Sequence, residues 1–410
     1  MTYTSEAFKS KIQKSNRLVG LVNMGADEII FAVSYGLWLI AALLLGTFFA
    51  SPIGTNTLDG LRCLGLAGIA LSTLVMGKWQ AAEVLAVPAL FVCALVMSRS
   101  GAQWLLDLVL LVYCARHMNF RIVAKETLWL SLVVLFLTIL ACKIGIIRNY
   151  RTVTYGANGA VRAREYLGFL YALIPAQIMF NITCLVVYLK GKSFNLIDAL
   201  FLSLVNFYIY VKTDSRLSFF LTICLVLAVV LINFVQIRRF FLLLFERVAP
   251  AVFVCCFGIS WIITANYPKL GSIGNRLNSL LGGRLWLGFS AISKYGTSLL
   301  GQKVSFIGNG LTAEGHLNKS GVYNYVDCLY VRLPVLYGWV FTALFVAGMT
   351  LVIIAALKNK DIYLCLVLVV IALHCVVDDL SIRPQYCAFL ILMGISFVEA
   401  IRRASKAKNS

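Results

Sequence analysis

The stretch that decides the fold occupies residues 335–357 and reads VLYGWVFTALFVAGMTLVIIAAL. It carries no charged side chain, and it is longer than the roughly 20 residues that a helix needs to cross a ~30 Å hydrocarbon layer. Apolar runs of similar length recur along the chain between short clusters of charge. The sequence therefore predicts an all-α, polytopic transmembrane protein with about twelve spans. We expect the spans at 29–50, 60–77, 81–98, 102–116, 127–147, 165–189, 194–211, 217–236, 249–266, 335–357, 361–380 and 385–401.

The composition supports lipid as the main solvent. Hydrophobic residues make up 61% of the 410 residues and charged residues only 13%, against roughly 45–50% and about 25% in soluble domains. One globular core cannot bury this excess. The stretch from Met1 to Asp27 is polar and basic, and the first long apolar run starts at Ile29, so we expect no cleavable signal peptide.

The formal charge of +19 needs a membrane explanation rather than a nucleic-acid partner, because no basic arm with interleaved aromatics is present. Most cations flank the spans, and cytoplasmic loops are the ones enriched in Lys and Arg. Twelve alternating spans place six basic clusters on one face, which we assign to the cytoplasm together with both termini. The clusters are Lys9/Lys11/Lys14/Arg17, Arg116/Arg121/Lys125, Lys190/Lys192, Arg238/Arg239, Lys358/Lys360 and Arg402/Arg403/Lys406/Lys408.

This topology divides the chain into five parts. They are a cytoplasmic segment (1–28), spans one to nine (29–266), a long extracytoplasmic loop (267–334), spans ten to twelve (335–402) and a cytoplasmic tail (403–410). Within the long loop, residues 277–300 show the pattern of an amphipathic helix at the interface.

The cysteines and the standard motifs indicate neither disulfides nor cofactors. The twelve cysteines are scattered, apart from the pair Cys255–Cys256, and nearly all lie in apolar runs, so we interpret them as small apolar side chains. HExxH, DxD and Walker sequences are absent, and no cluster has metal-ligand spacing. We expect no cofactor and no metal.

Arginines on the expected outer face oppose the usual topology signal. They lie in residues 148–164, which include Arg162 and Arg164, and in the long loop, where Arg276 and Arg284 flank a glycine pair. A guanidinium offers planar, bidentate donors suited to phosphate oxygens. The alternative is that these arginines pair with lipid headgroups or with Glu165.

A short outer turn, Thr213 to Arg216, lies between two spans. Ser215 can cap the amides of the following helix, but Arg216 at a helix start opposes the helix dipole. A phosphate-binding role explains that arginine, and a snorkelling anchor is the alternative.

His374 and Asp378 are four residues apart, which predicts one helical face at the outer end of the eleventh span. Asp379 and Arg383 follow. Ionisable groups near a membrane are costly and are therefore functional candidates. Alternatively, Asp378 or Asp379 merely neutralises a neighbouring arginine.

The order of these elements resembles the O-antigen and capsule polysaccharide polymerases (Wzy type), which are related to the O-antigen ligases. The resemblance covers roughly residues 120–400. It rests on Arg162-x-Arg164-x-x-x-Gly168-Phe169, Thr213-x-Ser215-Arg216, Arg276, Gly283-Arg284, Tyr295-Gly296…Leu299-x-Gly301, Val326-Asp327-x-x-Tyr330, Tyr337-Gly338 and His374…Asp378.

The resemblance implies an extracytoplasmic glycosyltransferase of the bacterial cytoplasmic membrane. It would move a growing glycan from its polyprenyl diphosphate onto the next lipid-linked repeat unit, beside a flippase and a chain-length regulator. Metal-free stabilisation of the leaving diphosphate by fixed arginines fits that chemistry. The implied roles are diphosphate binding for Arg216, Arg276, Arg284, Arg162 and Arg164, base catalysis for Asp378, Asp379 or His374, and other substrate contacts for Asp327, Tyr330 and Ser215.

Three alternatives stay open. Ligases tend to carry a His-Asn pair where this chain has Val326-Asp327, which favours a polymerase. A flippase would show inverted repeats and charges at mid-depth, where only Asp107, Asp198 and Lys143 are near candidates. A purely structural membrane protein would not explain the outward arginines. Polymerases often have an asparagine where this chain has Arg383-Pro384-Gln385, so the resemblance implies no role for that position.

Overall fold

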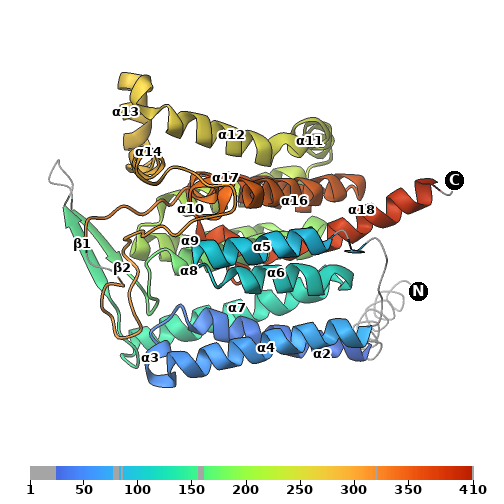
Figure 1. Cartoon of the computed structure of the whole chain (residues 1–410), viewed down its shortest axis with the longest axis horizontal. Coiled ribbons are helices and arrows are strands. Elements are labelled where there is room, and N and C mark those ends of the chain that lie inside the picture. Colours follow the sequence, from blue (N-terminus) through green and yellow to red (C-terminus); the bar gives the residue numbers. More distant parts are fainter. Residues whose placement is uncertain (1–24, 77–82, 85, 156–160, 319–320, 409–410) are drawn as a thin grey trace, which may run out of the picture.

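The computed structural model describes residues 25–76, 83–84, 86–155, 161–318 and 321–408, and its helices run side by side along the long axis of the molecule (Figure 1). The Lys9–Arg17 cluster lies outside these residues. The helices are α2 (Ala26–Leu44), α3 (Ala50–Ile53), α4 (Thr55–Met76), α5 (Ala86–Ser100), α6 (Leu105–Cys114), α7 (Phe120–Lys143), α8 (Ile174–Lys190), α9 (Leu196–Thr213), α10 (Arg216–Ile232), α11 (Val235–Val248), α12 (Val252–Ala265), α13 (Gly271–Leu280), α14 (Arg284–Tyr295), α15 (Leu329–Arg332), α16 (Gly338–Lys358), α17 (Ile362–His374) and α18 (Leu392–Lys408).

Seven helical segments in the described residues are long and apolar enough to cross a membrane, and three shorter helices, α5, α10 and α17, are also apolar. The chain is therefore a multi-pass membrane protein built from helices. Two expected spans have no such helix. The span expected at 102–116 is the ten-residue α6, about 15 Å long, and the one expected at 385–401 contains α18, whose C-terminal half is basic.

Two strands interrupt the helical pattern, which the all-α prediction missed. β1 (Arg151–Tyr155) and β2 (Val161–Glu165) pair antiparallel, with Arg151 opposite Glu165 and Val153 opposite Ala163. Alternation of apolar and polar residues in this stretch is typical of a strand rather than of a loop.

The sixth expected span starts later than residue 165. Residues 166–173 run across the end of the bundle, where the Leu170 amide donates to Gly46 O (2.9 Å) and the Phe48 amide donates to Gly168 O (2.9 Å). These backbone groups are used outside a helix, so α8 can begin only at Ile174.

The amphipathic helix expected at 277–300 is two helices, α13 and α14. Gly282 and Gly283 separate them, with φ of +64° and +87°, a region that favours glycine. Residues 296–318 and 321–328 then fold over the end of the bundle, where the Leu311 amide donates to Leu170 O (2.9 Å) and the Tyr166 hydroxyl to Asn309 O (3.0 Å). Figure 1 shows the strands, α3 and this segment at one end, here called the hairpin end, and the C-terminus of α18 at the other.

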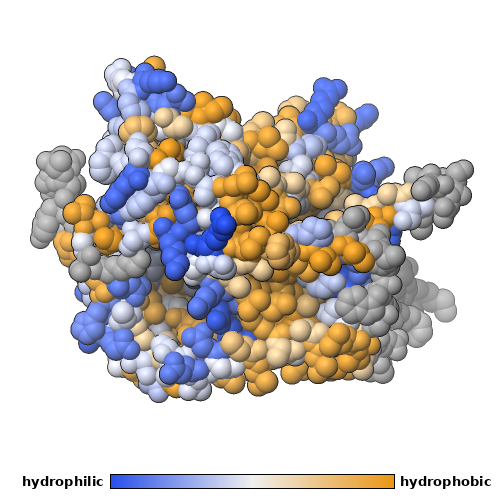
Figure 2. All heavy atoms as spheres, in the orientation of Figure 1, coloured by the Kyte–Doolittle hydropathy of each residue, from blue (hydrophilic) through white to orange (hydrophobic). Residues whose placement is uncertain are grey.

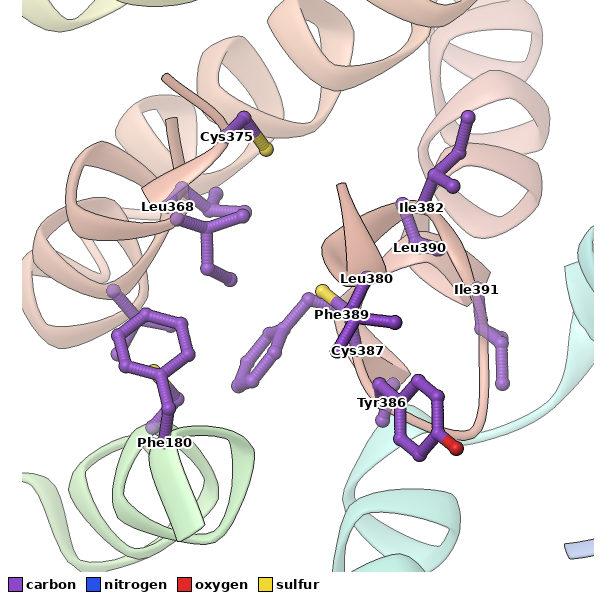
Figure 3. Close-up of a cluster of buried hydrophobic side chains, with 14 of the residues drawn as sticks. Phe180, Leu368, Cys375, Leu380, Ile382, Tyr386, Cys387, Phe389, Leu390 and Ile391 are labelled. Carbon is purple, nitrogen blue, oxygen red and sulfur yellow. The ribbon is translucent and has the colours of Figure 1, made fainter. Parts of the chain in front are cut away.

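The eleventh expected span ends early, because α17 stops at His374 and residues 375–391 form turns and short 3₁₀ segments. Figure 3 shows side chains of this segment, among them Leu380 and Phe389, gathered with Phe180 of α8. Buried backbone groups outside regular helices need hydrogen-bond partners elsewhere in the protein. Polar side chains of α8 supply such partners: Gln177 Nε2 donates to Tyr386 O (3.1 Å), and Asn181 Oδ1 accepts from the Ala388 amide (3.3 Å).

The surface agrees with a membrane setting. Figure 2 shows apolar residues over the middle of the bundle and hydrophilic residues gathered toward the hairpin end. Exposed apolar side chains such as Leu196, Ile197 and Phe136 are 72%, 77% and 65% exposed, a pattern that lipid rather than water favours.

Candidate functional site

A polar cavity of about 500 Å³ lies at the hairpin end, and we call it the arginine cavity. It is formed by β2, the start of α10, the α13–α14 turn, the segment before α15 and the turn after α17. Of the residues proposed from the sequence, six line it: Arg164, Ser215, Arg216, Arg284, Asp327 and Asp378.

Arg284 is held firmly at the first turn of α14. Its Nε donates to Val377 O at 3.1 Å and lies 3.5 Å from Asp327 Oδ2, and its Nη1 donates to Leu281 O at 3.0 Å. The Gly282–Gly283 turn directs the chain so that this arginine reaches the segment after α17. A guanidinium fixed in this way can face an anion without first losing much freedom.

Arg216 begins α10 and is more exposed than Arg284. Its Nε bonds Asp214 Oδ1 at 2.8 Å, while 62% of the side chain stays exposed. Ser215 makes no capping hydrogen bond, so the expectation of a serine cap was wrong. Its Oγ accepts from the Thr213 hydroxyl at 2.9 Å instead, which leaves the first amides of α10 without a cap from this side chain, in a wall of the cavity.

The hairpin supplies the third arginine. Arg164 lies opposite Thr152 in the strand register, and both residues line the arginine cavity. Arg162 lies on the same strand, opposite Thr154, and its side chain is outside the described part of the structure.

Two carboxyl groups of the cavity have unusual proton affinities. Burial raises the pKa of Asp327 to about 6, against the lowering effect of Arg284. Burial and the nearby Asp379 raise the pKa of Asp378 well above its usual range, although the Leu380 amide donates to its Oδ1 at 2.7 Å. At pH 7 Asp327 is therefore mostly ionised, whereas burial and the neighbouring Asp379 favour the protonated form of Asp378.

Arg276 and His374 do not reach the cavity. Arg276 is exposed on α13. His374 is fully buried: Nε2 lies 3.0 Å from Ser218 Oγ, Nδ1 lies 3.1 Å from Ser381 Oγ, and its ring stacks on Phe180 at 4.3 Å. With α17 ending at His374, the expected helical face shared with Asp378 does not exist. His374 supports the wall through Ser218.

Asp379 and Tyr330 are also turned away. Asp379 Oδ2 accepts from Tyr325 OH (2.9 Å) and pairs with Arg332 Nη1 (2.8 Å). Tyr330 is fully buried and donates to Ala372 O at 2.9 Å. For Asp379, the alternative of neutralising an arginine matches the observed contacts.

Sequence reasoning missed the aromatic and amide members of the site. Tyr166, Tyr171, Asn309 and Tyr323 line the cavity from the segments that cross the hairpin end. Asn309 and Tyr323 lie in the long loop that the sequence predicted, but Tyr166 and Tyr171 lie within the span expected at 165–189, so nothing in the sequence marked them as cavity residues. Among the described residues, no group of three His, Cys, Asp or Glu side chains is placed to hold a metal ion.

Comparison with known proteins finds no matching family, no matching curated protein and no matching solved structure. The geometry of the arginine cavity therefore carries the functional argument.

Proposed function

We propose that this chain is an extracytoplasmic glycosyltransferase of the bacterial cytoplasmic membrane that polymerises polyprenyl-diphosphate-linked oligosaccharide repeat units. The observation that carries the proposal is the meeting of Arg164, Arg216 and Arg284 with Asp327 and Asp378 around one cavity at the hairpin end. These residues come from segments that are far apart in the sequence, and no single helix or turn accounts for all five charged side chains.

The electrostatics suit a diphosphate. Three guanidinium groups line the cavity together with the carboxyls of Asp214, Asp327 and Asp378, and the raised pKa of buried Asp378 shifts the charge balance of the cavity toward positive. Fixed donors aimed at the position where charge develops are usually the largest catalytic contribution. Departure of the lipid diphosphate, which takes the bonding electron pair, is the step that these arginines would favour.

Asp327 is suited to accept the proton of the attacking hydroxyl group. A hydroxyl of the incoming repeat unit attacks the anomeric carbon of the growing glycan, the bond from that carbon to the diphosphate oxygen breaks, and the hydroxyl proton passes to the Asp327 carboxylate. A base works best when its pKa lies near the operating pH, which the value of about 6 meets. Burial favours the protonated form of Asp378, a form that donates a hydrogen bond and does not act as a base.

The finer topology belongs to the same proposal: about twelve spans, both termini in the cytoplasm and the hairpin end outside. Its supports are the basic clusters of the sequence and the placement of strands β1 and β2 and of residues 296–318 and 321–328 at the end opposite the C-terminus of α18 (Figure 1). Cysteine accessibility labelling at exposed residues near Arg216, with an impermeant reagent, tests it directly. Labelling from the cytosol alone would overturn the assignment.

The functional test is complementation of a strain that lacks this chain. The strain should accumulate single lipid-linked units without long glycan, and Arg284→Ala and Arg216→Ala should not restore chain length at normal membrane levels. Lys269→Ala, an exposed cation outside the cavity, is the matched control. Arg276→Ala should restore full length, because its side chain does not line the cavity.

Other outcomes of the complementation test would indicate another class of protein. Accumulation of undecorated long polymer would indicate a ligase, and loss of outward-facing units would indicate a flippase. Full-length glycan from the double variant Arg216→Ala/Arg284→Ala would overturn the role of the cavity.

A further inference from the structure

A second cavity, of about 590 Å³, lies beside the arginine cavity and has a different chemistry. We call it the aromatic cavity. The rings of Trp104, Phe306, Tyr325 and Tyr386 line it, together with the planar side chains of Arg62 and Arg383. Its walls come from α4, α6, the long segment before α15 and the turn after α17.

The two cavities share a wall. Tyr171, Asn309 and Tyr323 line both of them, and Asp327 lies on the arginine side. A molecule that fills the aromatic cavity therefore lies next to the cavity that contains Asp327.

The charges of the aromatic cavity are fixed and mostly compensated. Asp107, only 4% exposed, accepts from Trp38 Nε1 (3.1 Å) and from Arg62 Nη1 (3.0 Å). Arg62 Nε also pairs with Asp59 at 3.2 Å. Burying such groups within an apolar bundle is costly, and the packing of α4 on α6 alone would not require them.

Arg332 also lines the aromatic cavity and is held by its neighbours. It pairs with Asp379 and stacks on the rings of Tyr325 and Phe306, with its Cζ 4.5 Å and 5.1 Å from their centroids. Cation–π contacts of this kind fix the orientation of the ring as well as the guanidinium.

Arg383 is different. Its Cζ lies 5.5 Å from the Trp104 ring centroid, and the ion pairs among the described residues give it no carboxylate within 4.0 Å. The guanidinium N–H groups of Arg383 therefore line the cavity beside the Trp104 ring, and no carboxylate among the described residues pairs with them.

This combination fits a carbohydrate. A pyranose has an apolar C–H face, which packs on an aromatic ring, and vicinal hydroxyls, which bond in pairs to planar donors and acceptors such as Arg, Asp, Asn and Gln. Sites with apolar walls and a few convergent polar groups fix a ligand's orientation in this way. A diphosphate fits less well, because it has no apolar face to pack on the rings of Trp104, Tyr325 and Tyr386.

We propose that the aromatic cavity binds the oligosaccharide of the acceptor, while the arginine cavity holds the diphosphate of the donor. The assignment of acceptor rests on the proposed function, and the binding of a carbohydrate does not. Because the two cavities are adjacent, the accepting hydroxyl would lie near Asp327, between the two sites.

Binding is tested on the full chain in nanodiscs, by saturation-transfer NMR with repeat-unit oligosaccharides cut from the cells' own surface polysaccharide. Saturation transfer should be lost in Trp104→Ala and in Gln103→Trp, and kept in Lys269→Ala. Gln103 is exposed at the rim of the cavity, so the tryptophan fills the opening without disturbing the packed bundle. Unchanged transfer in both variants would overturn the proposal.

The role as acceptor site is tested with two substrates that separate the halves of the reaction. One is a lipid-linked unit whose accepting hydroxyl is methylated, so that it can only donate. The other carries a methylene in place of the oxygen between sugar and diphosphate, so that it can only accept. Gln103→Trp should raise the KM of the second at least tenfold and leave that of the first unchanged.

The failures are distinguishable. If the chain binds sugar but the complementation test shows no polymerisation, the proposed function is wrong and the carbohydrate-binding site stands. Polymerisation that depends on Arg284 but shows equal KM changes for both substrates in Gln103→Trp would sink the acceptor site and leave the proposed function.

Discussion

Asp327 provides the sharpest test of the proposed chemistry. Its carboxyl has an ordinary pKa of 3.8, which burial raises to about 6 in the folded protein. If Asp327 accepts the proton of the sugar hydroxyl, turnover should fall below pH 6 along a single ionisation. At pH 5 the rate should be about one tenth of the plateau.

Asp327→Asn should lower the plateau roughly 10²- to 10⁴-fold and remove the break near pH 6. Asp378→Asn is the matched variant. Burial raises the pKa of Asp378 and favours its protonated form, which an amide imitates, so we expect less than a tenfold loss. The assay follows glycan length from lipid-linked units in nanodiscs between pH 4.5 and 8.

The same shift has a consequence for stability. A carboxyl whose pKa is raised by folding stabilises the fold below pH 3.8, and that stability is lost as pH rises through about 6. The difference between the two pKa values corresponds to about 3 kcal/mol. The Tm of the wild type should therefore fall relative to that of Asp327→Asn between pH 4 and 6.

Two results would refute this reasoning. One is an Asp327→Asn variant that retains the break near pH 6 with a rate within tenfold of the wild type. The other is a Tm difference between the two proteins that does not change with pH.

The bundle itself permits further predictions. Gln177→Leu leaves backbone acceptors such as Tyr386 O without their donor and should destabilise the chain by about 1–3 kcal/mol, seen as a lower Tm in detergent. Gly394→Ala would place a Cβ 1.9 Å from Val112 O, where α18 crosses α6, and should cost about 1–3 kcal/mol or more through overpacking. Gly60→Ala meets no atom within 4 Å and should leave the Tm unchanged. Equal Tm values for Gly394→Ala and Gly60→Ala would contradict the close packing.

Part of the candidate site was accessible from the sequence. Arg216 and Arg284 were recognisable because charge beside apolar runs is costly. The sequence could not separate Arg284 from Arg276, since both flank the same glycines, and only the turn at Gly282–Gly283 sends one inward and leaves the other exposed on α13.

For the aromatic cavity, too, the sequence reveals the charged residues but not how they are arranged. Arg62 and Asp107 could be noticed as charges inside apolar runs, but their pairing joins helices that are distant in the sequence. Nothing local to either residue specifies the partner, or the position of Trp104 and Arg383 beside them.

The sequence by itself determined that this is a helical membrane protein and roughly where most of its helices lie. Hydropathy is a property of each residue, summed over a window that matches the bilayer, so no tertiary contact is needed to detect it. Tertiary structure decided where α17 stops, because Gln177 and Asn181 of another helix satisfy the backbone of residues 375–391. It also decided which arginines meet, because a cavity is formed by side chains from distant segments whose distances only the packing of the chain can set.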